Sequence, residues 1–166
     1  MKITISVLAI GKSTYPVCLD LCLTSRALGA SEITFVGKQD TRLVRHLGRL
    51  STKWGGKFRV NYVKNYREVL KQSAKYKKVY LTRLGEPLQS KNYMLRTYKN
   101  IVLVVTPSDG KKENQISRVA DFNISVSSQP HCSTAAVAIF LHEYYEGREL
   151  AMHFENAKYK PGRKES

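Results

Sequence analysis

The feature that most constrains how this chain can fold is a regular alternation of two hydrophobic periods. Short runs rich in apolar and β-branched residues recur along the chain, and segments with a helical period lie between them. Helices between strands act as crossovers that return the chain to the same end of a sheet, so the strands run parallel. The sequence therefore predicts an α/β fold, a parallel sheet with helices on both faces. The expected strands are residues 3–10, 32–36, 58–63, 79–82, 101–105 and 122–126, and the expected helices are residues 17–28, 41–54, 66–75, 89–96, 114–119 and 133–146.

The length and composition of the chain favour one domain with a short basic extension. With 166 residues, of which 42% are hydrophobic, the chain can bury a core of its own. We expect the domain to span residues 1–150 and the extension, which is rich in lysine and arginine, to span residues 151–166. No apolar run approaches the roughly 20 residues of a membrane span, and the three cysteines favour reduced thiols without a zinc site. These features predict a cytoplasmic protein with no membrane partner and no metal.

The net charge is far from that of an ordinary globular protein. The chain has 28 Lys and Arg against 13 Asp and Glu, which gives +15 at pH 7. A surplus of this size repels itself unless an anionic partner neutralises it, and nucleic acid is the usual partner of such proteins. An anionic membrane surface is the alternative, but the N-terminal segment has no hydrophobic signal region. We therefore expect RNA as the partner.

One predicted helix, residues 41–54, carries an uninterrupted row of positive charge. Leucines and a tryptophan repeat along it at helical spacing, and a second stripe of cations, here called the basic ridge, follows at i, i+3, i+7 and i+11. No acid separates these cations, which favours a surface that binds phosphates over one that is only solvated. Nearby tyrosines could stack on unpaired bases, although most tyrosines simply pack. The basic ridge consists of Arg42, Arg45, Arg49 and Lys53, and the other candidate RNA-binding residues are Lys38, Lys57, Arg59, Lys158, Lys160, Arg163 and Lys164.

Three loops that follow predicted strands are candidate ligand sites, namely residues 81–87, 106–110 and 127–133. Open parallel sheets bind ligands at loops beyond the carboxyl ends of their strands, although glycine and proline in such loops also serve ordinary turns. The third loop leads into the Ala-rich helix 133–146, for which Ser133 is a suitable N-cap that leaves backbone N–H groups free. This helix is apolar nearly all round, so we expect it in a subunit interface or deep inside the fold.

Several short segments together resemble a known enzyme family. They are Leu23-Thr24-Ser25-Arg26-Ala27-Leu28-Gly29-Ala30, Lys53-Trp54-Gly55-Gly56, Leu81-Thr82 with Gly85, Ala120-Asp121-Phe122-Asn123, and Gln129-Pro130-His131 before the Ala-rich helix. In this order they resemble the archaeal tRNA 2′-O-methyltransferases of the SPOUT superfamily, which modify a T-loop cytidine. The resemblance runs from Leu8 to Leu150, and the Gln-Pro-His and Trp-Gly-Gly segments are its most specific parts.

The resemblance implies a SPOUT-like parallel sheet with a C-terminal trefoil knot, and a homodimer built partly on the last helix. It also implies that S-adenosylmethionine would bind among the three loops. The residues that the resemblance assigns to the cofactor are Leu84, Gly85, Pro87, Thr106, Gly110, Gln129, Pro130 and Ser133.

Two segments depart from the pattern of the family. Family members carry several arginines soon after the first strand, and one of them is expected to activate the ribose hydroxyl, which is a poor nucleophile near neutral pH. The corresponding segment here, residues 9–18, is shorter and has Lys12 as its only cation. The second loop, residues 106–110, looks longer than that of the family and lacks its leading glycine.

These departures, the net charge and the basic extension lead us to interpret the chain as an RNA-binding SPOUT-fold protein that has lost methyltransferase activity. On this interpretation it binds structured RNA stably, as a ribosomal or ribosome-associated protein on rRNA, and needs no cofactor. The alternative is an active S-adenosylmethionine-dependent 2′-O-methyltransferase of tRNA or rRNA, in which Arg26 or Lys12 replaces the missing arginine. A third hypothesis, a dimeric scaffold that recruits another protein to RNA, rests only on the apolar last helix.

Overall fold

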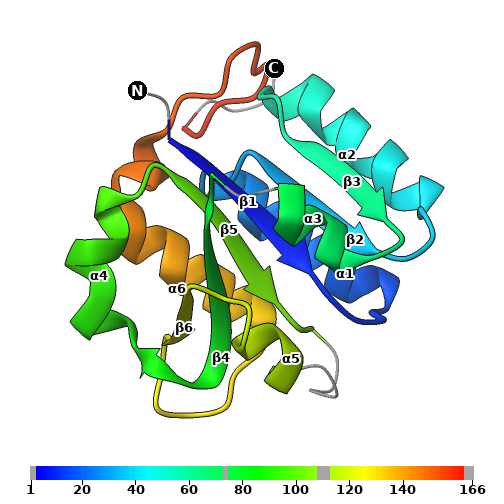
Figure 1. Cartoon of the computed structure of the whole chain (residues 1–166). Helices are drawn as coiled ribbons and strands as arrows, with labels where there is room; N and C mark the ends of the chain where they lie inside the picture. The colour runs from blue at the N-terminus through cyan, green and yellow to red at the C-terminus, as the bar shows by residue number, and fades with distance from the viewer. Residues whose placement is uncertain (1–2, 73–74, 108–112, 163–166) are drawn as a thin grey trace.

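The computed structural model describes residues 3–72, 75–107 and 113–162 and shows one sheet of six parallel strands (Figure 1). The strand order is β3-β2-β1-β5-β4-β6, so the N-terminal half of the chain extends the sheet on one side of β1 and the C-terminal half on the other. None of the described helices is both long enough and apolar enough to cross a membrane. The strands are β1 (Thr4–Ala9), β2 (Glu32–Val36), β3 (Arg59–Val63), β4 (Lys77–Pro87), β5 (Asn100–Val105) and β6 (Phe122–Ser125), and the helices are α1 (Tyr15–Ala27), α2 (Thr41–Trp54), α3 (Tyr66–Gln72), α4 (Leu88–Thr97), α5 (Glu113–Ser117), α6 (Ser133–Tyr145) and the 3₁₀ helix η1 (Arg148–Ala151).

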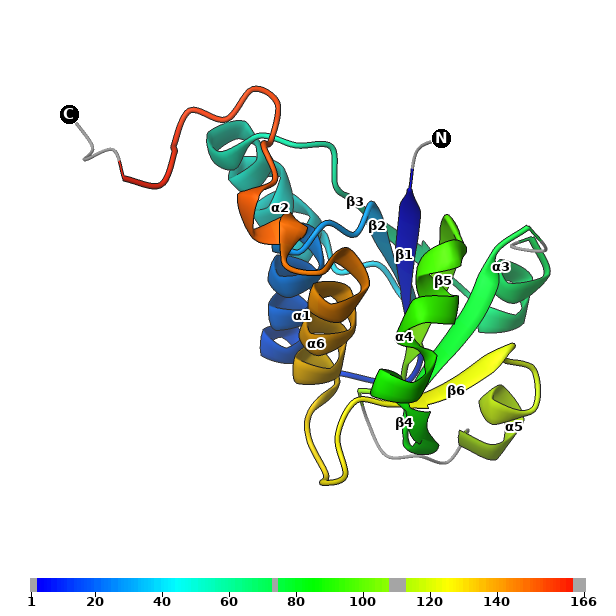
Figure 2. The same cartoon turned by 90° about the vertical axis from the view of Figure 1, so that its left-hand side faces the viewer.

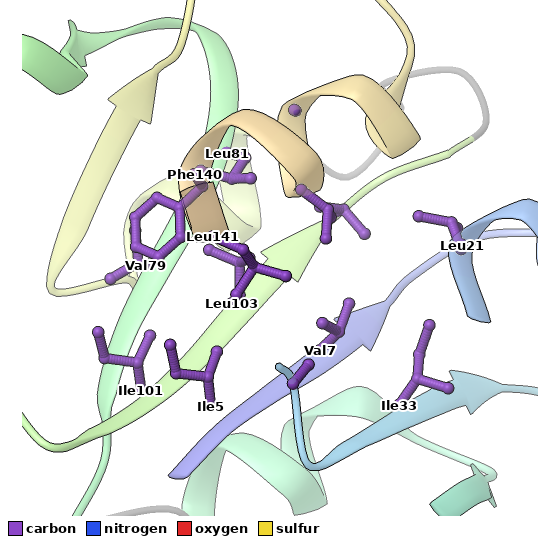
Figure 3. Close-up of a cluster of buried hydrophobic side chains, with 14 of the residues drawn as sticks. Ile5, Val7, Leu21, Ile33, Val79, Leu81, Ile101, Leu103, Phe140 and Leu141 are labelled. Atoms are coloured by element: carbon purple, nitrogen blue, oxygen red, sulfur yellow. The ribbon is translucent and has the colours of Figure 1, made fainter. Parts of the chain in front are cut away.

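The two faces of the sheet carry separate cores because successive side chains of a strand point in opposite directions. Figure 3 shows part of the larger core, in which Val7 and Leu103 of the central strands meet Leu141 of α6. The smaller core on the other face includes Tyr66 of α3 and Ile116 of α5. Figure 2 shows the resulting layers, with α1, α2 and α6 on one side of the sheet and α3 and α5 on the other. The predicted parallel α/β fold with helices on both faces is confirmed.

The element boundaries differ from the prediction mainly at β4. The sequence predicts a strand over residues 79–82, whereas β4 extends from Lys77 to Pro87 because it resumes its pairing with β6 after an interruption. α1 begins at Tyr15, before the predicted start, since proline is well suited to the first turn of a helix. The trefoil knot is a property of the whole chain path and stays a prediction.

The described part of the C-terminal extension packs across the ends of α1 and α2. Phe154 lies under the guanidinium group of Arg26, with 5.2 Å between Cζ and the ring centroid. Further along, the backbone N–H groups of Lys158 and Tyr159 donate to the carbonyl oxygen of Lys53 at 2.9 and 3.1 Å. These contacts fix the extension against α2, and the predicted boundary between domain and extension falls inside η1.

Candidate active site and nucleic-acid surface

A cavity of about 710 Å³ opens where β4 and β5 end and α6 begins. The carboxyl ends of parallel strands meet at this edge of the sheet, and open α/β sheets bind their ligands there. We call this cavity the edge pocket. Its described lining consists of Val17, Asp20, Leu23 and Thr24 of α1, Leu81, Thr82 and Arg83 of β4, Thr106 and Pro107 after β5, Glu113 of α5, and His131, Cys132, Ser133, Thr134 and Ala136 around the start of α6.

The end of β4 reaches the edge pocket because its pairing with β6 is interrupted. Ile124 of β6 pairs with Leu81 before the interruption and with Glu86 after it, so the residues between them leave the ladder and carry Arg83 to the pocket. Gly85 ends this excursion in close contact with β6, since a Cβ atom at Gly85 would lie 2.5 Å from the backbone nitrogen of Ile124. The close approach of two strands therefore explains the glycine.

The amino end of α6 presents polar groups to the edge pocket. Cys132 caps the helix, because its Sγ accepts a hydrogen bond from the backbone N–H of Ala135 at 3.5 Å, one residue before the predicted cap Ser133. The Nδ1 atom of His131 lies 3.2 Å from the carbonyl oxygen of Cys132. Its Nε2 atom is buried and has no hydrogen-bond partner within the described ranges. Burying an unpaired ring nitrogen is energetically costly.

The charged groups of the edge pocket are few and partly paired. Arg83 lies 4.0 Å from Glu113, with 60% and 32% of the two side chains exposed, and Asp20 is an exposed second acid. The hydroxyl of Thr106 lies 3.2 Å from that of Tyr80. Burial raises the pKa of Tyr80, so its proton stays in place near neutral pH. The described lining of the pocket thus offers hydroxyl groups, two carboxylates and one arginine.

The structure brings two of the predicted cofactor residues, Thr106 and Ser133, into the lining of the edge pocket. Leu84, by contrast, is 92% exposed, because the excursion of β4 turns it towards solvent. The remaining candidates are Gly85 and Pro87 at the end of β4, Gln129 and Pro130 in the exposed loop before His131, and Gly110, which lies outside the described residues.

Neither predicted activating residue lies in the edge pocket. Lys12 is exposed between β1 and α1, at the same edge of the sheet but outside the pocket lining. Arg26 lies at the far end of α1, where its Nη2 donates to the carbonyl oxygen of Gly55 at 2.5 Å, and burial lowers its pKa. The cation that does line the pocket is Arg83, which sequence reasoning missed although it is the only cation in the loop 81–87.

A second cavity, of about 790 Å³, runs along α2, and we call it the α2 groove. The basic ridge forms one of its walls, as the helical spacing of its residues predicts. Asp40 caps this helix by accepting hydrogen bonds from the backbone N–H groups of Arg42 and Leu43 at 2.9 and 3.4 Å. The groove is lined by Tyr15, Arg42, Arg45, His46, Arg49, Leu50, Thr52, Lys53, Trp54 and Tyr159.

The other candidate RNA-binding residues differ in their surroundings. Lys57 and Arg59 form exposed ion pairs with acids, at 3.7 and 2.9 Å. Exposed ion pairs contribute little to stability, so both cations can exchange an acid for a phosphate. Of the remaining candidates, Lys38, Lys158 and Lys160 are exposed, and Arg163 and Lys164 lie outside the described residues.

Comparison with known proteins decides the family. The model of the family described as tRNA ribose 2′-O-methyltransferase, aTrm56, matches residues 54–165, which is more than half of the chain. The chain belongs to this family. The tRNA (cytidine(56)-2′-O)-methyltransferase of Methanobrevibacter smithii is 33% identical over 150 residues, which cover 89% of this chain and 82% of that enzyme. The enzyme of the same name from Methanopyrus kandleri is 33% identical over 140 residues, which cover 83% and 78% of the two chains.

Solved structures of RNA methyltransferases share the fold of this chain. The SpoU methyltransferase AviRb from Streptomyces viridochromogenes superposes with a TM-score of 0.67 at 17% identity, over 89% of this chain and 61% of AviRb. A second structure, described as an RNA 2′-O ribose methyltransferase, gives a TM-score of 0.66 at 17% identity, over 89% and 58% of the chains. This chain therefore spans about three-fifths of those structures. At such identities the likeness shows the fold alone, and it confirms the predicted SPOUT-like α/β fold.

Membership of the aTrm56 family corrects the main functional interpretation. The prediction of a non-catalytic ribosomal protein that binds rRNA is wrong, because curated relatives that cover most of the chain are named as tRNA methyltransferases. The prediction that the chain is not an enzyme is wrong for the same reason, and the expectation that it needs no cofactor loses its basis. The absence of arginine from the short segment after β1 was therefore a poor guide to activity.

Proposed function

We propose that this chain is an S-adenosylmethionine-dependent 2′-O-methyltransferase that acts on tRNA in the cytoplasm. The observation that carries the proposal is membership of the aTrm56 family, whose relatives in M. smithii and M. kandleri are named for methyl transfer to the 2′ oxygen of cytidine 56 of tRNA. AviRb, which shares the fold, has been solved in complex with AdoMet. The edge pocket lies where such a sheet binds its ligands.

The edge pocket fits S-adenosylmethionine in size and in chemistry. Its volume of about 710 Å³ lies within the range of small-molecule sites. Thr106 and Ser133 offer hydroxyl groups to the polar parts of the cofactor, and Val17 and Leu81 offer apolar surface. When bound, the cofactor supplies an electrophilic methyl group.

We assign the activation of the ribose hydroxyl to Arg83 and Glu113. The 2′ oxygen must lose its proton as it forms its bond to carbon, and a carboxylate within reach of the hydroxyl can accept that proton. A guanidinium group stabilises the negative charge that develops on the oxygen. Arg83 and Glu113 lie 4.0 Å apart at the pocket, so one hydroxyl could contact both.

We also propose a homodimer that uses the adjoining surfaces of α1 and α6. Val17 and Ile139 are large apolar side chains that are 36% and 38% exposed on two helices that pack against each other. Because Val17 also lines the edge pocket, a partner subunit docked here would lie beside the site. Sedimentation equilibrium tests this, since Ile139→Glu should convert a dimer to a monomer, and a wild-type monomer at all concentrations would refute it.

Transfer of tritiated methyl groups from S-adenosylmethionine to tRNA transcripts tests the proposed function. We expect one methyl group per tRNA, and the phosphodiester that follows the modified nucleotide should resist alkaline cleavage because its 2′ oxygen is blocked. A matched transcript with 2′-deoxycytidine at position 56, the cytidine in the names of the relatives, should accept no methyl group because it lacks the nucleophile. Absence of transfer to any tRNA at saturating cofactor would falsify the proposal.

A further inference from the structure

The α2 groove carries cations that have no acidic partner. In the described ranges, Arg42 pairs with Asp40 at 3.1 Å, whereas Arg45, Arg49 and Lys53 form no ion pair. The residues that the structure describes along the groove include no acid. From Arg45 to Lys53 the unpaired cations extend over roughly 12 Å of helix. A row of unpaired positive charges of this length fits a polyanion rather than a single small anion.

Aromatic rings lie at both ends of the same groove. Tyr15 lies at one end, where the Cζ atom of Arg42 is 4.8 Å from its ring centroid. At the other end, Trp54 is 41% exposed and meets Tyr159 with 5.4 Å between ring centroids and 66° between ring planes. An indole ring that remains this exposed at a helix end is not needed for the core, and it offers surface on which a base can stack.

The C-terminal segment holds the aromatic end of the groove in place. The backbone N–H group of Tyr159 donates to the carbonyl oxygen of Lys53 at 3.1 Å, and the Nζ atom of Lys53 lies 5.8 Å from the centroid of the Tyr159 ring. The backbone therefore positions Tyr159 beside Trp54 before any ligand arrives. Preorganised rings lose little conformational entropy when they bind.

We propose that the α2 groove binds unpaired nucleotides of the RNA substrate, with their phosphates on the basic ridge and a base stacked on Trp54. This inference rests on the proposed function only in taking RNA as the substrate of the edge pocket. A paired helix would hide its base faces inside the stack, so aromatic rings within a groove favour a loop or a single strand. The segment recognised is therefore a looped part of the RNA.

The fluorescence of Trp54 tests the proposal directly, because the chain has a single tryptophan. Three probes are titrated: an RNA stem-loop with an unpaired loop, a fully paired RNA duplex with the same number of phosphates, and polyglutamate. The stem-loop should quench the fluorescence of Trp54. The midpoint of the quenching should agree with the dissociation constant obtained from the anisotropy of a labelled stem-loop. The duplex should bind more weakly and leave the fluorescence unchanged. Binding of the stem-loop without quenching would overturn the proposal, as would equal quenching by polyglutamate, which would indicate an acidic protein as the partner.

Matched variants separate stacking from charge. Trp54→Leu should weaken binding of the stem-loop about 5- to 160-fold, the loss expected for one stacked base, while Trp54→Phe should recover most of the affinity. Arg45→Ala/Arg49→Ala should weaken binding of both RNAs, whereas Lys64→Ala/Lys71→Ala removes two exposed charges beside α3 on the other face and should change little. Equal effects of the two double variants would overturn the role of the ridge.

The same preparations keep this inference distinct from the proposed function. If wild type transfers methyl groups and Trp54→Leu has the same KM for RNA as wild type, the groove assignment is overturned and the enzymatic proposal stays intact. Quenching by the stem-loop in a protein that transfers no methyl group would support the groove and count against the enzymatic proposal.

Discussion

The edge pocket and the α2 groove lie on either side of α1 but differ in the groups that line them. Tyr15 at the start of α1 lines the groove, whereas Val17 and Asp20, less than two turns later, line the pocket. In the described lining of the pocket, Arg83 is the one lysine or arginine, and it is paired with Glu113. The described lining of the groove has cations and aromatic rings without an acid.

This difference corresponds to two tasks that an RNA methyltransferase must combine. Reacting groups must be held to within about 0.5 Å, and the pocket achieves this with a strand excursion locked against β6 and a capped helix start. Retention of a polyanion depends on the number of charges near its phosphates more than on the exact place of each, and a helix supplies these charges by simple repetition. The pocket therefore depends on contacts between distant segments, and the groove depends on one local repeat.

Among the variants, Arg83→Ala should show the largest difference between its effect on catalysis at the edge pocket and its effect on RNA binding in the α2 groove. Loss of a donor that stabilises a developing oxyanion lowers kcat about 100- to 1000-fold. Because Arg83 lies outside the groove and more than half of its side chain is exposed, affinity for RNA and the fold should be preserved. Single-turnover methyl transfer together with RNA anisotropy measures both effects. Arg118→Ala, which removes another exposed arginine, is the matched control, and an unchanged rate in Arg83→Ala would exclude Arg83 from the reaction.

Ionic strength should separate the two ligands without any substitution. If the four cations of the basic ridge contact phosphates of an unpaired strand, affinity for RNA should fall about 50-fold between about 50 and 200 mM salt, from a slope of about −0.7 per contact. Binding of S-adenosylmethionine, measured by calorimetry, should change less than about twofold because the pocket lacks such a row of charges. Arg45→Ala/Arg49→Ala should reduce the RNA slope by about 1.4. Equal salt dependence for the two ligands would contradict the division of tasks.

The substitution Gly55→Ala adds a single methyl group, which should disturb the structure of the α2 groove and leave the edge pocket unchanged. Gly55 ends α2 with φ of 72°, and a Cβ atom there would lie within contact distance of the backbone of the C-terminal segment, too close to the carbonyl oxygen of Glu155. Gly55→Ala should cost about 1–3 kcal/mol in urea unfolding and release Tyr159, which should weaken RNA binding several-fold.

Gly48→Ala is the control for the substitution at Gly55. Gly48 lies on the exposed side of the same helix with open space around it, so alanine should stabilise the helix by about 0.5–1 kcal/mol. Affinity for S-adenosylmethionine should stay unchanged in both variants. A Gly55→Ala protein that is as stable as wild type would show that the C-terminal segment is not anchored here.

Local patterns predicted the basic ridge better than the lining of the edge pocket. The spacing of the cations places them on one side of α2, and the structure confirms this arrangement. Trp54 was expected in the apolar stripe with Leu43 and Leu47, but the helix ends at Trp54, beyond the part that packs on the sheet, and the ring stays exposed. A periodic pattern gives the face of a helix and does not reveal how far the neighbouring layer extends.

The pocket could be predicted in place but not in composition. The alternation of strands and helices was enough to locate ligand loops at the carboxyl edge of the sheet. Which side chains line the pocket depends on the interrupted pairing of β4 with β6, which carries Arg83 inward and leaves Leu84 in solvent. Arg26 was predicted as an activating residue because the sequence does not show which groups contact it in the fold. In the structure its partner is Gly55, which is far away in the sequence.

The smallest expected effect is a change in the alkylation rate of a cysteine. This rate reports whether the edge pocket is occupied, without a measurement of catalysis. Cys132 is exposed at the pocket, whereas Cys22 is buried and burial raises its pKa to about 12, so Cys22 holds no appreciable thiolate at pH 8. Iodoacetamide should therefore modify Cys132 and spare Cys22 until the protein unfolds, and mass spectrometry of peptides measures both sites. Saturating S-adenosylmethionine should slow modification of Cys132 several-fold and leave Cys22 unaffected. Cys132→Ser is the control because the serine hydroxyl can still cap α6. This variant should bind the cofactor but give no modified peptide at position 132. Unchanged modification of Cys132 at saturating S-adenosylmethionine would mean that the cofactor does not bind in the edge pocket.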